Sequence, residues 1–370
     1  MGVSVLMGNW HTHVFTSTYT ADVSGVCSAL YELGGMTVLH DPSGCKSTYT
    51  THDEPRWYDS DSLMFISGLD EMTAVLGDDS VIIRDVVRAA KDLKPRFITL
   101  CGASIPHIIA FDYRGVARLI EKETGIPVLP VATDGLKSYV SGAGLAMKEW
   151  IRRFAERKAE KIPGRINLLG VTPVDFSRQE NADAMKKVFT DAGYSVRVFA
   201  MGETFENLQE AYQAECNVVV SSAGRNPAQY MFKTGKIPFV EGVPCGEQMA
   251  ERILQAVKTG TNQYVCDDYD PEGKILVIGE EIFAKSLASV LKGKPLYPDI
   301  DEGLDEDLLL QEMEKAEMII ADPLFRYGRR GNAVFIPFPH EGYSGRLFRK
   351  DIPVFAGKEF DIERYIREKK

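Results

Sequence analysis

The stretch Phe97-Ile98-Thr99-Leu100-Cys101-Gly102-Ala103-Ser104-Ile105-Pro106 decides the fold of this chain, because an apolar strand runs directly into a helix start. Phe97 to Leu100 is short and apolar, as in a buried strand, and Pro106 is typical of a first helical turn. In a parallel α/β sheet, strand ends and helix starts share the carboxyl edge. Cys101 is therefore expected at such an edge.

Two further cysteines stand at similar transitions. Cys27 opens a helix-like run, and Cys45 follows the strand-like Met36 to His40 and a Pro-Ser-Gly turn. Helix N-termini favour negative charge and lower thiol pKa values, so three thiols converging on this edge suit a metal or an iron-sulfur cluster. Their spacings fit no zinc motif. Burial as ordinary core residues is the alternative interpretation.

Four landmarks occur in the order of a known family: the segment 40–45 (HDPSGC), like its H-G-P-x-G-C; 76–79 (LGDD), like F-G-G-D; 100–112 (LCGASIPHIIAFD), like s-x-C-x-x-x-x-I-G-D-D; and 131–136 (VATDGL), like V-x-x-x-G-F. On these segments the chain resembles the component 1 proteins of nitrogenase, with their relatives the dark-operative protochlorophyllide reductase and the coenzyme F430 reductive cyclase. The resemblance is dense over roughly residues 20 to 150 and looser beyond.

The resemblance implies an iron-sulfur cluster held by Cys27, Cys45 and Cys101, with Gly44 and Gly102 letting the backbone approach the sulfurs. The cluster is expected at a dimer interface, formed with a second copy or with a paralogous subunit. It is either an eight-iron, P-cluster-like group or a four-iron, four-sulfur group. The resemblance also implies a separate ATP-dependent iron protein as electron donor. The chain itself has no G-x-x-x-x-G-K-[ST] motif.

The remaining pattern predicts an α/β fold with three Rossmann-like domains around a central cleft, because strands alternate with amphipathic helices throughout. The expected domains are 1–160, which binds the cluster, 165–262 and 270–370. Helices are predicted at 80–93, 108–123 and 142–157. An isoleucine-proline pair is expected to begin a strand at 126–127, 237–238 and 352–353, and this recurrence indicates three similar units.

The resemblance also indicates where a substrate or second metallocluster lies. Ser222 stands where nitrogenase has its cofactor cysteine, and His340 lies in a segment similar to that of the cofactor histidine. An iron-molybdenum cofactor held as in nitrogenase is therefore not expected, and whether another metallocluster is present stays open. His340 and His52 are candidate catalytic residues, since neutral imidazole moves protons near pH 7. Ser222, Arg225, Tyr343 and Arg346 are candidate substrate-binding residues, the arginines for an anionic group.

Composition narrows the function further. A formal charge of −10 argues against a nucleic-acid partner, and the chain has no apolar run long enough for a membrane span. Without a recognisable signal peptide, the protein is expected in the cytoplasm. The predicted function is an oxygen-sensitive, multi-electron reductase acting on a small molecule. The alternatives are a scaffold for metallocluster or cofactor assembly, and a metal-free small-molecule binding protein whose cysteines are core residues.

Overall fold

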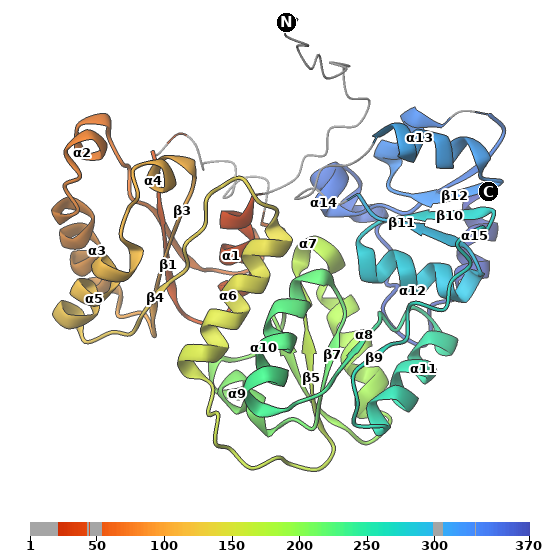
Figure 1. The fold of residues 1–370 in the computed structure, drawn as a ribbon, viewed down its shortest axis with the longest axis horizontal. Coiled ribbons are helices and arrows are strands. Elements are labelled where there is room, and N and C mark those ends of the chain that lie inside the picture. Colours follow the sequence, from red (N-terminus) through yellow and green to blue (C-terminus); the bar gives the residue numbers. More distant parts are fainter. Residues whose placement is uncertain (1–20, 43, 45–53, 299–305, 330) are drawn as a thin grey trace, which may run out of the picture.

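The computed structural model describes residues 21–42, 44, 54–298, 306–329 and 331–370, and within them it contains three sheets whose strands are all parallel (Figure 1). The predicted α/β fold class is confirmed. Each sheet places its second strand at one edge, followed in order by the first, third and fourth strands. This shared order agrees with the repetition expected from the sequence.

The first sheet has the order β2-β1-β3-β4, and its register pairs Leu39 of β1 with Cys101 of β3. Its strands are β1 (Met36–His40), β2 (Leu63–Ile66), β3 (Ile98–Gly102) and β4 (Val128–Pro130). Its helices are α2 (Glu71–Leu76), α3 (Ser80–Leu93), α4 (Ser104–Ile108) and α5 (Tyr113–Thr124).

The expected single helix at 108–123 was wrong, since two helices, α4 and α5, occupy this part of the chain. The break contains Ala110, which has a φ of 56°, in the left-handed region. Asp112 then caps α5 by accepting a hydrogen bond from the Gly115 N–H at 2.9 Å. A new N-cap therefore starts a separate helix at a point where the apolar periodicity alone predicted a single continuous helix.

The second and third sheets have the orders β6-β5-β7-β8-β9 and β11-β10-β12-β13. Their strands are β5 (Arg165–Leu169), β6 (Ser195–Phe199), β7 (Cys216–Val219), β8 (Phe239–Glu241), β9 (Gln263–Tyr264), β10 (Ile275–Ile278), β11 (Lys294–Leu296), β12 (Met318–Ala321) and β13 (Val334–Pro337). Their helices are α7 (Pro173–Phe176), α8 (Gln179–Thr190), α9 (Phe205–Gln209), α10 (Arg225–Gly235), α11 (Glu247–Lys258), α12 (Glu281–Leu291), α13 (Glu306–Lys315), α14 (Glu341–Ser344) and α15 (Ile362–Lys369).

Two of the three isoleucine-proline pairs lead into a strand, β4 and β8. The third does not, because the segment after Ile352 runs back across α8 of the second sheet. There the backbone N–H groups of Phe355 and Ala356 donate to Asn181 Oδ1 at 2.8 and 3.1 Å. The fourth strand of the third sheet is instead β13, which comes earlier in the chain.

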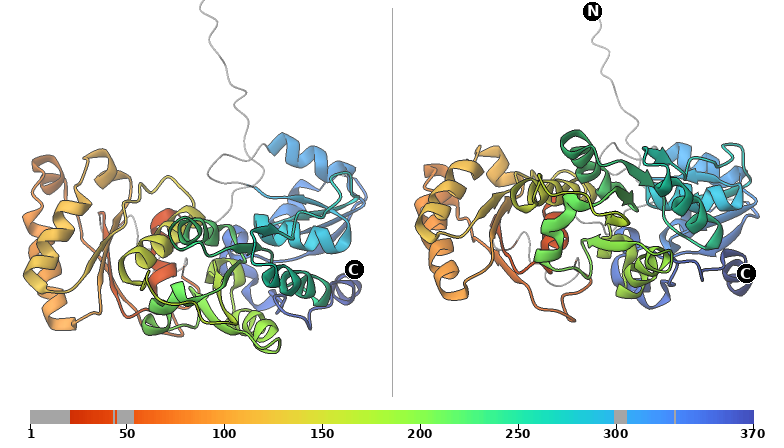
Figure 2. Two further views of the ribbon diagram at one scale, coloured as in Figure 1. Left: turned by 60° about the horizontal axis from the view of Figure 1, so that its bottom comes forward. Right: turned by 90° about the horizontal axis from the view of Figure 1, so that it is seen from below.

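Helix α1 (Asp22–Leu30) packs tightly against α6 (Tyr139–Phe154), as both views of the ribbon show (Figures 1 and 2). A Cβ on Gly25 would lie 2.1 Å from the Tyr139 carbonyl oxygen, and one on Gly142 would lie 1.8 Å from the Asp22 carbonyl oxygen. Only glycine fits such an approach of two backbones. One apolar core extends from α1 through the second sheet to α15.

None of the helices in the described part of the chain combines the length and the apolar character needed to cross a bilayer. The division into domains at 160–165 and 262–270 stays a prediction.

Candidate functional site

Two of the three predicted cluster cysteines have neighbouring side chains. Cys27 lies within α1 and Cys101 within β3, both are fully buried, and their thiols interact. Cys101 Sγ also lies 3.8 Å from the Val38 carbonyl oxygen. Burial raises the pKa of the Cys27 thiol, and Cys101 and the Glu54 carboxylate raise it further. Paired soft sulfur donors fit an iron-sulfur cluster, whose positive iron ions favour the thiolate form.

The other predicted cluster residues are Cys45, Gly44 and Gly102. Cys45, like the candidate catalytic residue His52, lies outside the described residues, so its assignment stays a prediction. Gly44 is exposed, and an added Cβ would meet nothing within 4 Å. Gly102 is buried, and a Cβ there would lie 2.0 Å from the Tyr113 hydroxyl oxygen, so its missing side chain makes room for that ring.

His40, at the end of β1, is buried beside these residues. Its Nδ1 lies 2.8 Å from Ser67 Oγ, and its ring contacts Phe111 with 4.2 Å between centroids. Burial lowers the pKa of His40 to about 4, so the ring is neutral at pH 7. This histidine therefore braces the end of β1 against β2 and does not carry charge.

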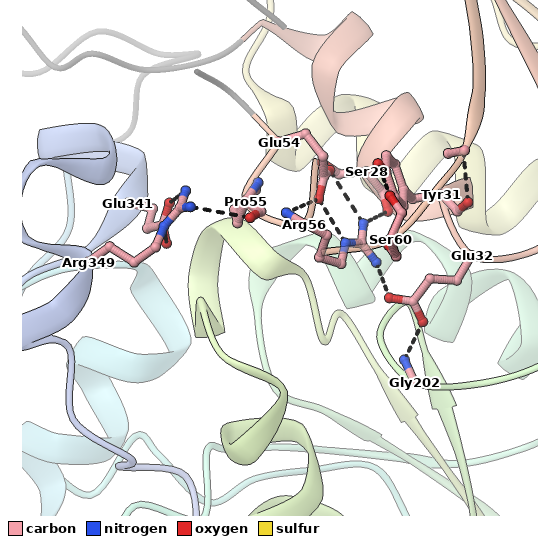
Figure 3. A network of polar contacts seen from close by, with 11 residues as sticks. Ser28, Tyr31, Glu32, Glu54, Pro55, Arg56, Ser60, Gly202, Glu341 and Arg349 are labelled. Carbon is pink, nitrogen blue, oxygen red and sulfur yellow. Dashed lines mark hydrogen bonds and ion pairs between the residues drawn. The ribbon is translucent and has the colours of Figure 1, made fainter. Parts of the chain in front are cut away.

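A buried ion pair between Glu54 and Arg56 lies beside Ser28 of α1 (Figure 3), and the charge of Glu54 acts on the neighbouring Cys27. Glu54 has a side chain that is 0% exposed, and it accepts hydrogen bonds from Ser28 Oγ at 2.5 Å and Arg56 Nε at 2.7 Å. Arg56 also donates to Glu32 at 2.6 Å and to the Ser28 carbonyl oxygen at 2.7 Å. Burial by itself raises the pKa of Glu54, but Arg56 and Ser28 more than offset it and hold that pKa below its ordinary value.

This network reaches elements of the second and third sheets (Figure 3). Glu32 accepts a hydrogen bond from the Gly202 N–H at 2.6 Å, in the loop after β6. The carbonyl oxygen of Pro55 accepts one from Arg349 at 3.2 Å, and Arg349 forms two bonds of 2.7 Å to buried Glu341 of α14. The segment 54–56 is thus tied to all three sheets.

A cavity of about 210 Å³ lies where strands of the second and third sheets end. Its wall contains four predicted residues, which follow β7 and β13: Ser222, Arg225, His340 and Tyr343. Loops at the carboxyl ends of parallel strands commonly form such sites. Arg346 is exposed and is not among the lining residues, which also include Ser138, Tyr139, Glu280, Glu281 and Tyr297.

Glu280 is the main buried acid of this cavity. Its Oε1 accepts hydrogen bonds from the N–H and hydroxyl of Ser222 at 2.7 and 2.6 Å, and its Oε2 caps α12 by accepting from the Phe283 N–H at 3.0 Å. Burial, together with the charge of Asp175, raises the pKa of Glu280 to about 7. Ser222 therefore serves to hold a carboxyl group that changes protonation near neutral pH.

His340 belongs to a second polar group in the same wall. Its Nδ1 accepts a hydrogen bond from the Gly342 N–H at 3.0 Å, so the ring proton is on Nε2, which lies 3.4 Å from Asp175 Oδ1. Asp175 also accepts hydrogen bonds from the Tyr139 hydroxyl and, at 2.6 Å, from Thr172 Oγ1. A buried carboxylate thus orients two side chains that face the cavity.

Arg225 is already engaged by two carboxylates. Its Nε and Nη2 lie 3.1 and 2.9 Å from Glu241 Oε2, and the guanidinium also pairs with Glu281. Lys285 pairs with Glu281 at 2.9 Å and with Asp267 at 3.2 Å. The expectation that Arg225 binds an anionic substrate stays untested, but its charge is balanced within the protein.

A family model described as nitrogenase component 1 type oxidoreductase matches residues 25–277, about two thirds of the chain. The chain belongs to this family. The matched segment includes β3, most of α1 and all three sequence-predicted cluster cysteines.

Individual relatives of this component 1 family member are distant. The nitrogenase molybdenum-iron protein alpha chain of Methanosarcina barkeri is 26% identical over 50% of this chain and 35% of its own length. The light-independent protochlorophyllide reductase of Gloeobacter violaceus has a subunit that is 23% identical over 49% of this chain and 38% of its own length. The iron-molybdenum cofactor biosynthesis protein NifE of Methanococcus maripaludis is 24% identical over 52% and 41%. The chain thus matches less than half the length of each.

Among solved structures, nitrogenase Cp1 at pH 6.5 superposes with a TM-score of 0.71 at 15% identity, covering 98% of this chain and 95% of that chain. The same protein at pH 5 gives a TM-score of 0.68. The similarity in fold therefore extends over nearly the whole of this chain, beyond residues 25–277, which the family model matches.

The sequence did not point to Asp175, Glu280 or Glu54. Asp175 and Glu280 each follow a strand that was predicted, at 166–170 and 274–279, so their place at a carboxyl edge was available as a signal. The burial of these two residues could not be predicted, because acidic residues after strands are usually exposed.

Proposed function

We propose that this component 1 family member is an iron-sulfur reductase that receives electrons from an ATP-dependent iron protein and reduces a small molecule in the cavity beside Glu280. The observation that carries the proposal is the adjacency of the buried Cys27 and Cys101 thiols within the segment that the family model matches. The family match and the resemblance of residues 40–45 support Cys45 as the third ligand.

The proposed cluster lies at an interface between two copies of the chain or between this chain and a paralogous subunit, as the resemblance implies. A cluster in this position supplies one-electron transfer. The protein's own part is to exclude water around Cys27 and Cys101, both 0% exposed, and to fix α1 through Gly25 and the Glu54–Arg56 pair. Glu280 is a suitable proton source for a reduction in the cavity.

The test is the iron and acid-labile sulfide content of anaerobically purified protein, with an EPR spectrum before and after dithionite. Replacing Cys27 or Cys101 by alanine is expected to remove most of the iron. The matched control is Cys266→Ala, since Cys266 is also a buried free cysteine and loses the same atoms. Equal iron in all variants, or no iron after anaerobic reconstitution, contradicts the ligand assignment.

The measured stoichiometry also separates the two cluster types. About two irons per chain corresponds to one four-iron cluster shared by two copies, and about four irons per chain corresponds to an eight-iron cluster in a dimer or to one four-iron cluster in each copy. Combining the iron content with the mass of the oligomer in solution distinguishes a symmetric dimer from a chain that needs a second subunit.

The similarity to the cofactor biosynthesis protein NifE supports one other role, a scaffold on which a metallocluster is assembled. A scaffold releases its cluster to an acceptor protein, whereas a reductase keeps it through repeated reduction by the iron protein. Following ⁵⁷Fe from the loaded chain during ATP-driven reduction distinguishes them, because only the scaffold loses the label.

A further inference from the structure

The cavity beside Glu280 has an excess of acidic groups. Four carboxylates line it or contact its lining residues: Asp175, Glu241, Glu280 and Glu281. The lining Arg225 is already paired with Glu241 and Glu281, and Lys285, which contacts Glu281, is also paired with Asp267. Burial lowers the pKa of His340, but Asp175, Asp322 and Glu280 raise it above its ordinary value, and a protonated ring would be paired with Asp175, which lies 3.4 Å from Nε2. An anion entering this cavity would meet no uncommitted cation among the described lining residues.

Two hydroxyl donors of the wall are also committed, whereas His340 Nε2 has no hydrogen-bond partner within the described protein. The Ser222 hydroxyl donates to Glu280, and the Tyr139 hydroxyl donates to Asp175. A hydroxyl that has given its proton offers only lone pairs to a second partner. The oxygens of Ser222, Tyr139 and Glu280 thus present acceptors, and a ligand that fits them must bring donors of its own.

Aromatic rings complete the wall with surfaces that suit the same chemistry. Tyr139, Tyr297 and Tyr343 line the cavity, and the Lys285 ammonium lies 5.5 Å from the Tyr297 ring centroid, so a cation already occupies the face of one ring. The negative faces of aromatic rings attract organic cations. Carboxylates, acceptor oxygens and rings therefore favour one ligand class.

We infer that this cavity binds a small organic molecule carrying a cationic or N–H-rich nitrogen group, such as an amidinium, and that Glu280 is the residue that recognises it. The inference rests on the proposed function only in taking this cavity as the substrate site. It differs from the sequence expectation, in which Arg225 received an anionic group. It also disfavours an anionic metallocluster in the cavity.

The experiment compares two probes of equal shape and opposite charge, benzamidine and benzoate, by titration calorimetry against the full-length, anaerobically purified protein at pH 8. Benzamidine is expected to bind at least tenfold more tightly than benzoate. Glu280→Gln, which keeps the size and the capping oxygen, should weaken benzamidine binding at least tenfold. Glu363→Gln is the matched control, because Glu363 is an exposed glutamate of α15, and it should leave the affinity unchanged.

Benzoate binding as tight as benzamidine, no binding of either probe, or an unchanged affinity in Glu280→Gln overturns the inference. The comparison of the two probes on the unaltered protein decides the matter even if the Glu280 variant does not fold. Iron content measured on the same preparation separates the two claims. Iron-free protein that prefers benzamidine contradicts the reductase, while iron-loaded protein that prefers benzoate contradicts only the ligand class.

Discussion

Replacing Arg56 by methionine tests how the buried ion pair beside Cys27 supports the cluster region. The change removes the cation from Glu54, whose side chain is 0% exposed, and leaves it the neutral donors Ser28 Oγ and the backbone N–H of residue 56. It also removes the bonds of Arg56 to Glu32 and to the Ser28 carbonyl oxygen in α1. Leaving one charge of a buried pair without its partner costs about 3–5 kcal/mol.

The suitable assay is hydrogen exchange of the amides in α1, residues 22–30, because a chain with three sheets need not unfold in one step. At about 1.36 kcal/mol per tenfold change, the expected loss corresponds to a fall in protection of roughly two to four orders of magnitude. Arg364→Met on α15 removes an arginine from an exposed pair with Glu368 and should leave exchange in α1 unchanged.

The pH dependence of this stability loss is a second, independent test of the ion pair. In the native protein the pKa of Glu54 is lowered, so its contribution to stability is present above its unfolded pKa and is lost on acidification. In Arg56→Met the charge that lowers this pKa is gone, and burial outweighs the two remaining hydrogen bonds and raises the pKa, so acidification now favours the folded state. The difference between the two proteins should therefore shrink from pH 7 to pH 5, and Glu54→Gln should rescue the Arg56 variant. A loss below about 1 kcal/mol at pH 7, or one that does not shrink at pH 5, refutes the reasoning.

Three further predictions follow from single sites. Because the pKa of Glu280 is raised to about 7, its contribution to stability should fall as pH rises from about 4.5 to 7, and melting temperatures of Glu280→Gln from pH 5 to 8 should lack this decline. The pKa of His40 is lowered to about 4, so His40→Gln should remove a loss of stability between pH 6.5 and 4, measured in the same way. Gly25→Ala should separate α1 from α6 and lower both the melting temperature and the iron content, while alanine at exposed Glu363 changes neither.

The architecture was predictable because strands and amphipathic helices alternate regularly, and this pattern is local. The sheet register then brought Cys101 beside the end of β1, as expected for a carboxyl edge. The prediction of one helix at 108–123 was wrong because Asp112 is an N-cap. This local signal starts a new helix even though the apolar periodicity continues across it. The strand predicted at the third isoleucine-proline pair does not form, because hydrogen bonds to Asn181 in helix α8 hold that segment.

The cavity was only partly predictable. Four of its lining residues were named from the resemblance, which fixes positions along the chain but not the chemistry of their neighbours. The residues that orient these side chains come from the ends of other strands: Asp175 contacts His340, and Glu280 accepts a hydrogen bond from Ser222. Pairing between loops of different sheets depends on how the sheets pack, and no spacing in the sequence encodes it.

The ion-pair network and the cavity are parts of one connected structure. Arg349 joins the Pro55 carbonyl oxygen to Glu341, and Glu341 follows His340 in the chain. Ser177, which follows α7 and so lies two residues from Asp175, donates to Glu341 at 2.6 Å. A displacement of segment 54–56 would thus be transmitted through Glu341 to His340 and, through Ser177, to Asp175, the two residues of the His340–Asp175 contact. The Arg56 variant therefore tests more than stability: if benzamidine affinity changes along with exchange in α1, the cysteine region and the cavity are mechanically coupled through Arg349, and if affinity stays constant they act independently.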